Sequence, residues 1–137
     1  MIKVTFFKRD GVYYGFRETG HAGFDDAGKD IVCAAVSAMT MLVINAIEVS
    51  YESNVEYSID EDTADIEVKV PSALPENSDD ETKRFAVSGL IEAYFMQLID
   101  MLEHGARECP DSLGSFFQVS GVRFEIHTYN EDRKSVV

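Results

Sequence analysis

The chain has 137 residues, 45% of them apolar, and its 12 basic and 25 acidic side chains give a formal net charge of −13. A chain of this length fits one domain and buries enough surface to fold without disulfides or metal ions. The acidic balance repels phosphate backbones and therefore argues against nucleic-acid binding.

The first part of the chain predicts a β-hairpin followed by a helix. Residues 2–8 and 12–18 are rich in β-branched and aromatic types and have a turn signal between them. Glycine and aspartate then mark residues 19–29 as a loop. A helix is expected from Asp30 or a near neighbour to about Glu48. Because this helix is apolar all round, we expect it to be covered on several sides.

A second hairpin and a second helix are predicted downstream. Residues 54–59 and 64–70 alternate between apolar and polar types and flank an acidic turn. After a linker, apolar residues follow the 3.6-residue period over 80–104, which predicts a helix. Residues 116–128 predict one or two further strands, and residues 129–137 are polar and expected to be loose.

The order ββ-α-ββ-α-β(β) predicts an α+β fold, with a mostly antiparallel sheet and two main helices packed on it. We expect a single domain over residues 1–128 and a polar C-terminal tail over 129–137. The apolar run 31–47 is shorter than the roughly 20 residues that span a bilayer, so we interpret it as a buried helix. The N-terminal pattern is not that of a secretion signal, so we expect a cytoplasmic protein that has no membrane partner and contains free thiols.

The negative charge is concentrated in one segment. Residues 48–82 carry twelve acidic side chains and one basic side chain, Lys69. An acidic surface attracts a basic peptide or protein and speeds the encounter. The same surface also keeps a protein soluble without any partner, and the sequence leaves both interpretations open.

The stretch GHAGFDDAGKDIVCAAVSAM, residues 20–39, places a histidine loop before a cysteine near a predicted helix start. A thiol becomes a nucleophile when it loses its proton, which a helix N-terminus and a neighbouring histidine both favour. Cys33 is expected in the first turn of the helix, where backbone N–H groups can also bind an oxyanion. His21 lies between Gly20 and Gly23, which free the backbone around it. Such a loop can fold back and bring the imidazole near the sulfur.

Two further side chains have more than one interpretation. Asp30 can cap the helix or orient His21. Ser37, one turn after Cys33, can bond a substrate, the sulfur or the Cys33 carbonyl. By residue type alone, Cys33 is more often a small buried hydrophobe, and His21 an ordinary loop histidine. Residue types alone therefore leave the chemistry of this stretch open.

No metal ion and no cofactor is expected. His104, Cys109 and His127 lack the paired spacing of a zinc site. The Gly-His-Ala-Gly loop lacks the pattern of a phosphate-binding loop. The acidic turn at residues 60–62 lacks the glycine and the closing glutamate of a calcium loop.

The pairing of GHAGF with DIVCAAVSAM resembles the bacterial family of ribosomal-processing cysteine proteases known as Prp. Members of that family carry a Gly-His-Ala-Gly-aromatic loop followed by an Asp-Ile-Val-Cys-Ala-Ala-Val-Ser-Ala helix start. The match runs through residues 20–24 and 30–38, and the order of hairpins and helices also agrees over about residues 1–105.

The resemblance implies a small homodimeric cysteine protease that removes a short N-terminal extension from a large-subunit ribosomal protein, after a hydrophobic, Phe-containing sequence. The family nucleophile falls on Cys33 and the general base on His21. The loop is thought to move when substrate binds. The supporting or substrate-binding positions implied in this way are Gly20, Gly23, Asp30 and Ser37. The acidic surface fits such a partner, because ribosomal proteins are basic.

Two other interpretations remain open on the sequence. The chain is alternatively a non-catalytic acidic dimeric module that binds basic ribosomal proteins or peptides, with Cys33 packed in its core. It is otherwise a structural or assembly protein whose apolar first helix forms a dimer interface. That interface predicts that Met41 and Ile44 point outward.

Overall fold

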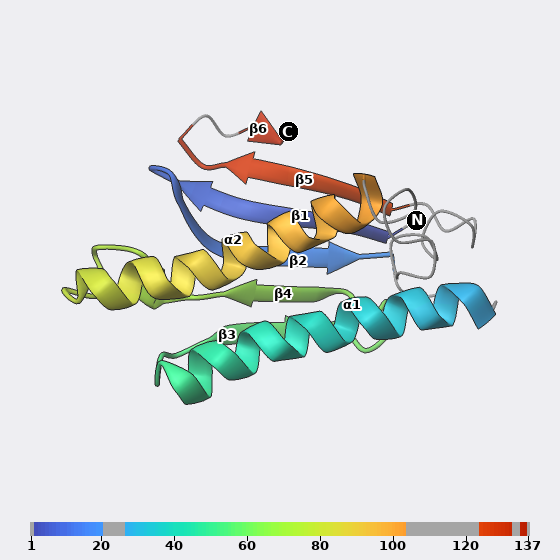
Figure 1. Cartoon of the computed structure of the whole chain (residues 1–137), viewed down its shortest axis with the longest axis horizontal. Coiled ribbons are helices and arrows are strands. Elements are labelled where there is room, and N and C mark those ends of the chain that lie inside the picture. Colours follow the sequence, from blue (N-terminus) through green and yellow to red (C-terminus); the bar gives the residue numbers. More distant parts are fainter. Residues whose placement is uncertain (1, 21–26, 104–123, 133–134, 137) are drawn as a thin grey trace.

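The computed structural model describes residues 2–20, 27–103, 124–132 and 135–136. In this part of the chain the elements follow the predicted order (Figure 1). The strands are β1 (Ile2–Arg9), β2 (Val12–Thr19), β3 (Glu56–Ile59), β4 (Ile66–Lys69), β5 (Phe124–Asn130) and β6 (Ser135–Val136). The helices are α1 (Ala27–Asn45), the π-helix η1 (Ala46–Ser50), the 3-10 helix η2 (Pro71–Ala73) and α2 (Glu81–Glu103).

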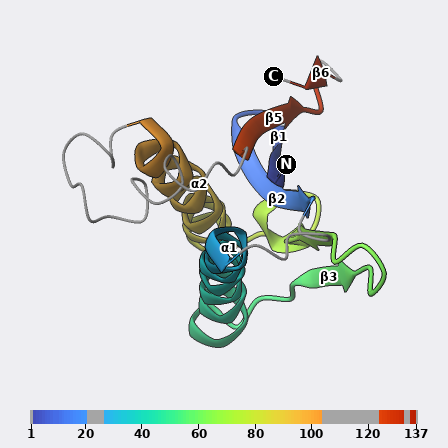
Figure 2. The same ribbon diagram turned by 90° about the vertical axis from the view of Figure 1, so that its right-hand side faces the viewer.

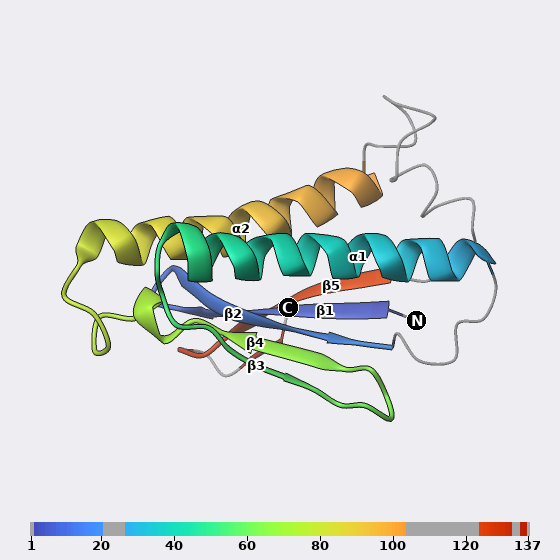
Figure 3. The same ribbon diagram turned by 90° about the horizontal axis from the view of Figure 1, so that it is seen from below.

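Across the described residues, six strands form one sheet in the order β3-β4-β2-β1-β5-β6. Its neighbouring pairs are antiparallel except β1 and β5, which run parallel. The strand β1 lies inside the sheet because β2 and β5 pair with its two edges. Both α1 and α2 cover the same face of the sheet (Figure 2 and Figure 3). The prediction of an α+β fold, with two helices on a mostly antiparallel sheet, is confirmed.

The hydrophobic core lies between the sheet and the two helices. Alternate residues of a strand point to opposite faces, and one face of β1 is fully buried while the other is not. The helix α2 buries one apolar residue per turn, as the 3.6-residue period predicts. The buried apolar residues of these two elements are Ile2, Val4, Phe6, Val87, Ile91, Tyr94 and Leu98.

The helix α1 differs from its prediction at both ends and on its outer side. It begins at Ala27, three residues early, and continues into η1, which ends at Ser50. Met41 is 48% exposed and Leu42 is 69% exposed, so the expectation of cover on several sides is wrong for the described chain. Met41 points outward as predicted, whereas Ile44 is only 3% exposed and lies in the core. Among the described helices, none is long and apolar enough to cross a bilayer.

The C-terminal strand β5 continues to Asn130, beyond the predicted boundary at residue 128. Its neighbour Glu131 donates its backbone N–H to the Lys8 carbonyl at 2.8 Å, and Asp132 accepts the Asp10 N–H at 2.8 Å. This differs from the loose tail expected over 129–137, because parallel pairing with β1 extends through Asn130 and the two hydrogen bonds hold the next two residues. The predicted strand positions 116–123 lie outside the described residues.

Candidate active site

The strand β2 ends and the helix α1 begins at the same end of the molecule (Figure 1 and Figure 3). The last described residue after β2 is Gly20, whose φ of +87° is a left-handed conformation that favours glycine. Its N–H donates to Asp65 Oδ1 at 3.4 Å, which ties this point to the β3–β4 hairpin. His21 and Gly23 lie outside the described residues.

The helix backbone places Asp30 and Cys33 farther inside α1 than predicted. Because α1 begins at Ala27, Asp30 is its fourth residue, not its cap, and Cys33 is its seventh residue. The expectation that Cys33 occupies the first turn is therefore wrong. The partial charge of a helix end falls off within the first turn, so it favours a thiolate less at this position than predicted. The side chains of both residues lie outside what the structure describes.

Position 33 shares one side of α1 with two described polar residues. Positions 33, 37 and 40 are separated by four and three residues and therefore share one side of the helix. On this side, Thr40 is 1% exposed and Ser37 is half-buried. The predicted supporting residue Ser37 thus shares that side of the helix with position 33.

A buried polar cluster is made of Glu18, Thr40 and Tyr94. Glu18 is fully buried, and its Oε1 accepts hydrogen bonds from Thr40 Oγ1 and, at 2.7 Å, from Tyr94 Oη. The two hydroxyl oxygens are 3.2 Å apart, and the Val36 carbonyl oxygen lies 3.5 Å from the Tyr94 hydroxyl. The cluster therefore connects β2, α1 and α2.

The Tyr94 hydroxyl is a donor at every working pH. Burial raises its pKa above the ordinary value, and the Glu18 carboxylate raises it further. Two aromatic rings fix the tyrosine ring edge-on, namely Phe6 at 5.7 Å and Phe16 at 5.2 Å between centroids. A rigid ring therefore holds the hydroxyl toward the carboxylate.

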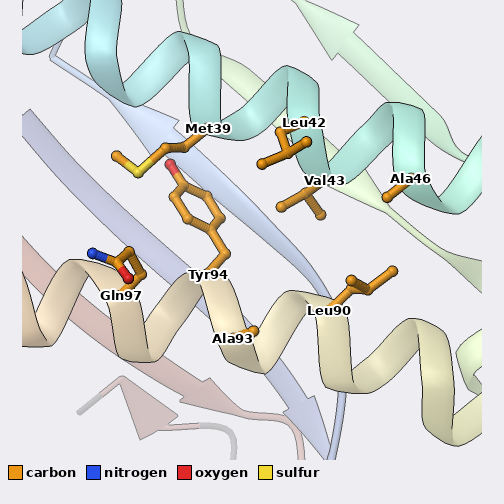
Figure 4. A pocket seen from close by; sticks show the side chains of 8 residues that line it. All are labelled: Met39, Leu42, Val43, Ala46, Leu90, Ala93, Tyr94 and Gln97. Carbon is orange, nitrogen blue, oxygen red and sulfur yellow. The ribbon is translucent and has the colours of Figure 1, made fainter.

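An apolar groove of about 300 Å³ runs between α1 and α2 on the side away from the sheet. Figure 4 shows the Tyr94 ring reaching from α2 toward α1, with Leu42 and Leu90 on opposite walls. The complete lining is Met39, Leu42, Val43, Ala46, Leu90, Ala93, Tyr94 and Gln97. Its low polarity suits an apolar side chain better than a charged ligand.

Part of the acidic segment, residues 56–69, forms the β3–β4 hairpin. All four residues of β3 are exposed, and the turn after it is organised by Asp60, whose Oδ1 accepts the N–H groups of Asp62 and Thr63 at 2.9 and 3.1 Å. These backbone hydrogen bonds lower the pKa of the Asp60 carboxyl. The turn leads directly into Asp65, the acceptor of the Gly20 N–H.

These features define a small α+β protein in which a segment containing Gly20 and His21 connects a sheet strand to a cysteine-bearing helix. The family model described as Cysteine protease Prp matches residues 1–109, a range that contains both His21 and Cys33. The chain therefore belongs to the Prp family of cysteine proteases. A comparison with curated protein sequences found no significant match to this chain.

Solved structures share the fold. The protein SMU.848 from Streptococcus mutans is 30% identical, with 93% of this chain and 95% of that chain covered and a TM-score of 0.64. The essential ribosomal processing protease Prp of Staphylococcus aureus, in complex with a substrate peptide, is 17% identical, with 96% and 100% covered and a TM-score of 0.62. The same protease with a covalently linked product peptide is 19% identical, with 92% and 99% covered and a TM-score of 0.56. Since 93% of 137 residues exceeds 109 residues, the structural likeness extends beyond the family match.

The sequence interpretation missed the buried cluster. A glutamate in a strand is ordinarily assigned to the exposed face, yet Glu18 follows Phe16 at a spacing of two and therefore shares its inward face. Thr40 was visible as a polar residue inside an apolar run. The spacing within β2 was a signal that could have placed Glu18 in the core.

Proposed function

We propose that this chain is a cysteine endopeptidase that removes a short N-terminal extension from a large-subunit ribosomal protein in the cytoplasm. Cys33 is the nucleophile and His21 the general base, supported by Gly20, Gly23, Asp30 and Ser37. The single observation that carries the proposal is the family match, which spans the whole His-loop and cysteine-helix motif. The common position of the β2 end and the α1 start supports it (Figure 3).

The proposed mechanism is acyl transfer through a thioester. His21 takes the thiol proton, and the Cys33 sulfur attacks the scissile carbonyl carbon. The C–N bond then breaks, and the leaving amine takes the proton back from His21. A water molecule deprotonated by His21 hydrolyses the thioester, which releases the second product and restores the thiol.

The charge of the exposed hairpin supports a basic substrate. The β3–β4 hairpin carries acidic side chains on an exposed strand and turn, at the side of the molecule where Asp65 holds Gly20. Such a surface steers a positively charged protein toward the adjacent loop. The carboxylates attract the substrate, and the loop and helix carry out the reaction.

The exposed apolar side of α1 supports a homodimer. Leu42 and Met41 are exposed next to the apolar groove. Monomeric proteins rarely leave a cluster of large apolar side chains exposed to solvent. A second copy packed on this side covers them without blocking the end of the molecule that carries the Gly-His loop.

The test is cleavage of a peptide copied from the N-terminal extension of the host's own ribosomal protein, followed by mass spectrometry. We expect one cut by the wild type, no cut by Cys33→Ala or His21→Ala, and normal cutting by Cys109→Ala, which removes the other cysteine. Equal cutting by Cys33→Ala would refute the proposed nucleophile.

The second candidate is a non-catalytic module that binds basic peptides, which the acidic hairpin favours. A peptide that binds the wild type but stays intact, with Cys33 inert to alkylation until the protein unfolds, would support that module.

A further inference from the structure

A fully buried glutamate joins the strand that leads to the histidine loop with the helix that carries the cysteine. Glu18 is the second-last residue of β2 and lies three positions before His21. Its carboxylate accepts a hydrogen bond from Thr40, which lies two helical turns after Cys33 on the same side of α1. One hydrogen bond therefore links the two backbone segments from which the proposed catalytic side chains depart.

We propose that Glu18 is a positioning residue that sets the separation of His21 and Cys33 through its hydrogen bonds with Thr40 and Tyr94. The inference rests on the proposed function and adds to it a group outside the His-loop and cysteine-helix motif. Glu18 acts by holding α1 at one axial and rotational setting relative to the end of β2. It does not touch the substrate.

The first argument is the direction of the bonds. Apolar contacts tolerate sliding of a helix along a sheet, whereas a hydrogen bond weakens steeply with distance and angle. Thr40 fixes α1 to Glu18, and Tyr94 fixes α2 to the same oxygen at 2.7 Å. Both helices are therefore hydrogen-bonded to the same atom, Glu18 Oε1, two residues before Gly20.

The second argument is the unfavourable desolvation of a carboxylate in the core. Glu18 is 0% exposed and lies across the sheet from Val4 and Ile66, two apolar residues. Apolar replacements of buried ionic groups are often neutral or stabilising, so stability alone does not account for a carboxylate here. A requirement for one defined arrangement of the helices does account for it.

The third argument is the weak support of α1 on its outer side. The groove of about 300 Å³ lies between α1 and α2 and is lined by Leu42 of α1 and Leu90 of α2. The Tyr94 ring reaches from α2 toward α1 (Figure 4), and its hydroxyl is within hydrogen-bond distance of Thr40 and Glu18. The polar cluster thus adds a directional restraint to the apolar contacts that hold α1 on the core.

The test compares variants that remove one donor of the cluster with a variant that removes the acceptor shared by both donors. Thr40→Val keeps the shape of the side chain and removes the donor, Tyr94→Phe removes the phenolic hydroxyl, and Glu18→Leu removes the acceptor. We expect kcat for peptide cleavage to fall roughly ten- to hundredfold in Thr40→Val and Glu18→Leu, because misplacement of about 1 Å has effects of this size. KM is expected to change little, since the substrate contacts remain.

The conservative variant Glu18→Gln keeps an acceptor oxygen for both hydroxyls. We expect it to recover most of the rate lost in Glu18→Leu. The pH dependence of Cys33 alkylation, located by peptide mapping, is a second readout. Its midpoint should move toward the free-thiol value of about 8.5 in Thr40→Val and Glu18→Leu and stay at the wild-type value in Glu18→Gln.

The matched control is Ser88→Ala. Ser88 is buried in α2, and its Oγ accepts the N–H of Tyr13 at 2.9 Å, so it joins α2, not α1, to the opposite end of β2. We expect this variant to lose stability but to keep its kcat and its alkylation midpoint, when all variants are assayed under conditions where each is folded.

The outcomes separate this inference from the proposed function. A wild type that cuts the peptide, with Thr40→Val and Glu18→Leu no slower than Ser88→Ala, rejects the positioning role and leaves the protease intact. Slower cutting by Glu18→Gln than by Glu18→Leu also rejects it. A wild type that does not cut, and whose Cys33 alkylates as an ordinary thiol in every variant, removes both proposals.

Discussion

Thr40 of α1 donates a hydrogen bond to the buried carboxylate of Glu18, the second-last residue of β2. The bond spans 22 positions of the sequence and joins the strand that precedes His21 to the helix that contains position 33. It belongs to a core that is otherwise largely apolar, so its contribution to stability can be measured separately from its proposed role in activity.

Loss of this donor should destabilise the fold by a measurable amount. A hydrogen bond to a charged group contributes about 1.5–3 kcal/mol, and a neutral one about 0.5–1.5 kcal/mol. We therefore expect Thr40→Val to lower the free energy of unfolding by about 1.5–3 kcal/mol, and Ser88→Ala by less. Urea denaturation followed by circular dichroism checks the order of the two values, and the reverse order would contradict a charged acceptor at Thr40.

A methyl group at Gly15 should disrupt the pairing of β2 with β4. A Cβ at this position would lie 2.4 Å from the Val68 carbonyl oxygen and 3.2 Å from both Lys69 Cα and Phe7 Cδ2. Two of these atoms are backbone and cannot move aside without separating the strands. We expect Gly15→Ala to destabilise the protein by about 1–3 kcal/mol, the usual range for overpacking.

Gly89 provides the matched control for this substitution. A Cβ built on Gly89 has no neighbour within 4 Å, and the residue lies in the interior of α2 on an exposed side. We expect Gly89→Ala to raise the free energy of unfolding by about 0.8–1 kcal/mol, the difference in helix propensity. The two alanine variants should thus move the urea midpoint in opposite directions. A shift in the same direction would show that the close approach at Gly15 is not present in solution.

A charge on the outer side of α1 should change the oligomeric state and not the fold. Leu42 is 69% exposed beside the groove, so Leu42→Glu leaves the folded monomer intact and places a carboxylate in the proposed dimer contact. Light scattering should report a dimer for the wild type and a monomer for Leu42→Glu. Tyr57→Glu, at a 52% exposed position of β3, serves as the control and should remain dimeric. A monomeric wild type would contradict the dimer.

The Asp60 carboxyl should stabilise the folded protein more when it is ionised than when it is protonated. Its folded-state pKa is lowered by backbone hydrogen bonds, so its contribution is complete above the unfolded value of about 3.9 and disappears as pH falls through the folded value. Asp60→Asn keeps an acceptor for the N–H groups of Asp62 and Thr63 without the charge. The difference in unfolding free energy between wild type and variant should therefore be constant near neutral pH and shrink below pH 4. A pH-independent difference would contradict the assigned shift.

The sequence predicted those elements that carry local signals. Asp10 and Gly11 have φ values of +51° and +76°, as a tight hairpin turn with positive φ at both central positions requires. The apolar period of α2 predicted a helix with the observed inward face. The start of α1 was misplaced because Gly28 suggested a bend, whereas the helix includes it in the first turn. Ile44 and Met41 were not distinguishable because a helix that is apolar all round has no period to orient it.

The candidate site was predictable only in part, for a related reason. His21 and Cys33 belong to a contiguous family motif, so the family could be inferred from a short stretch of sequence. Glu18 and Tyr94 come together from distant parts of the chain, and their hydrogen bond joins residues 76 positions apart. Such a pairing depends on how the helices pack on the sheet and leaves only a weak trace in the sequence.

The parallel pairing of β1 with β5 has a consequence for how the chain folds as it is made. Among the described strands β1 is synthesised first, and it lies inside the finished sheet. One of its two neighbours is β5, with Ile2 beside Phe124, which is synthesised after the other strands of the sheet core. The nascent protein can form its two hairpins and pack both helices, yet one edge of β1 stays open until residues 124–130 have been synthesised. That edge of β1 is therefore accessible to a chaperone or a neighbouring nascent chain until β5 pairs with it.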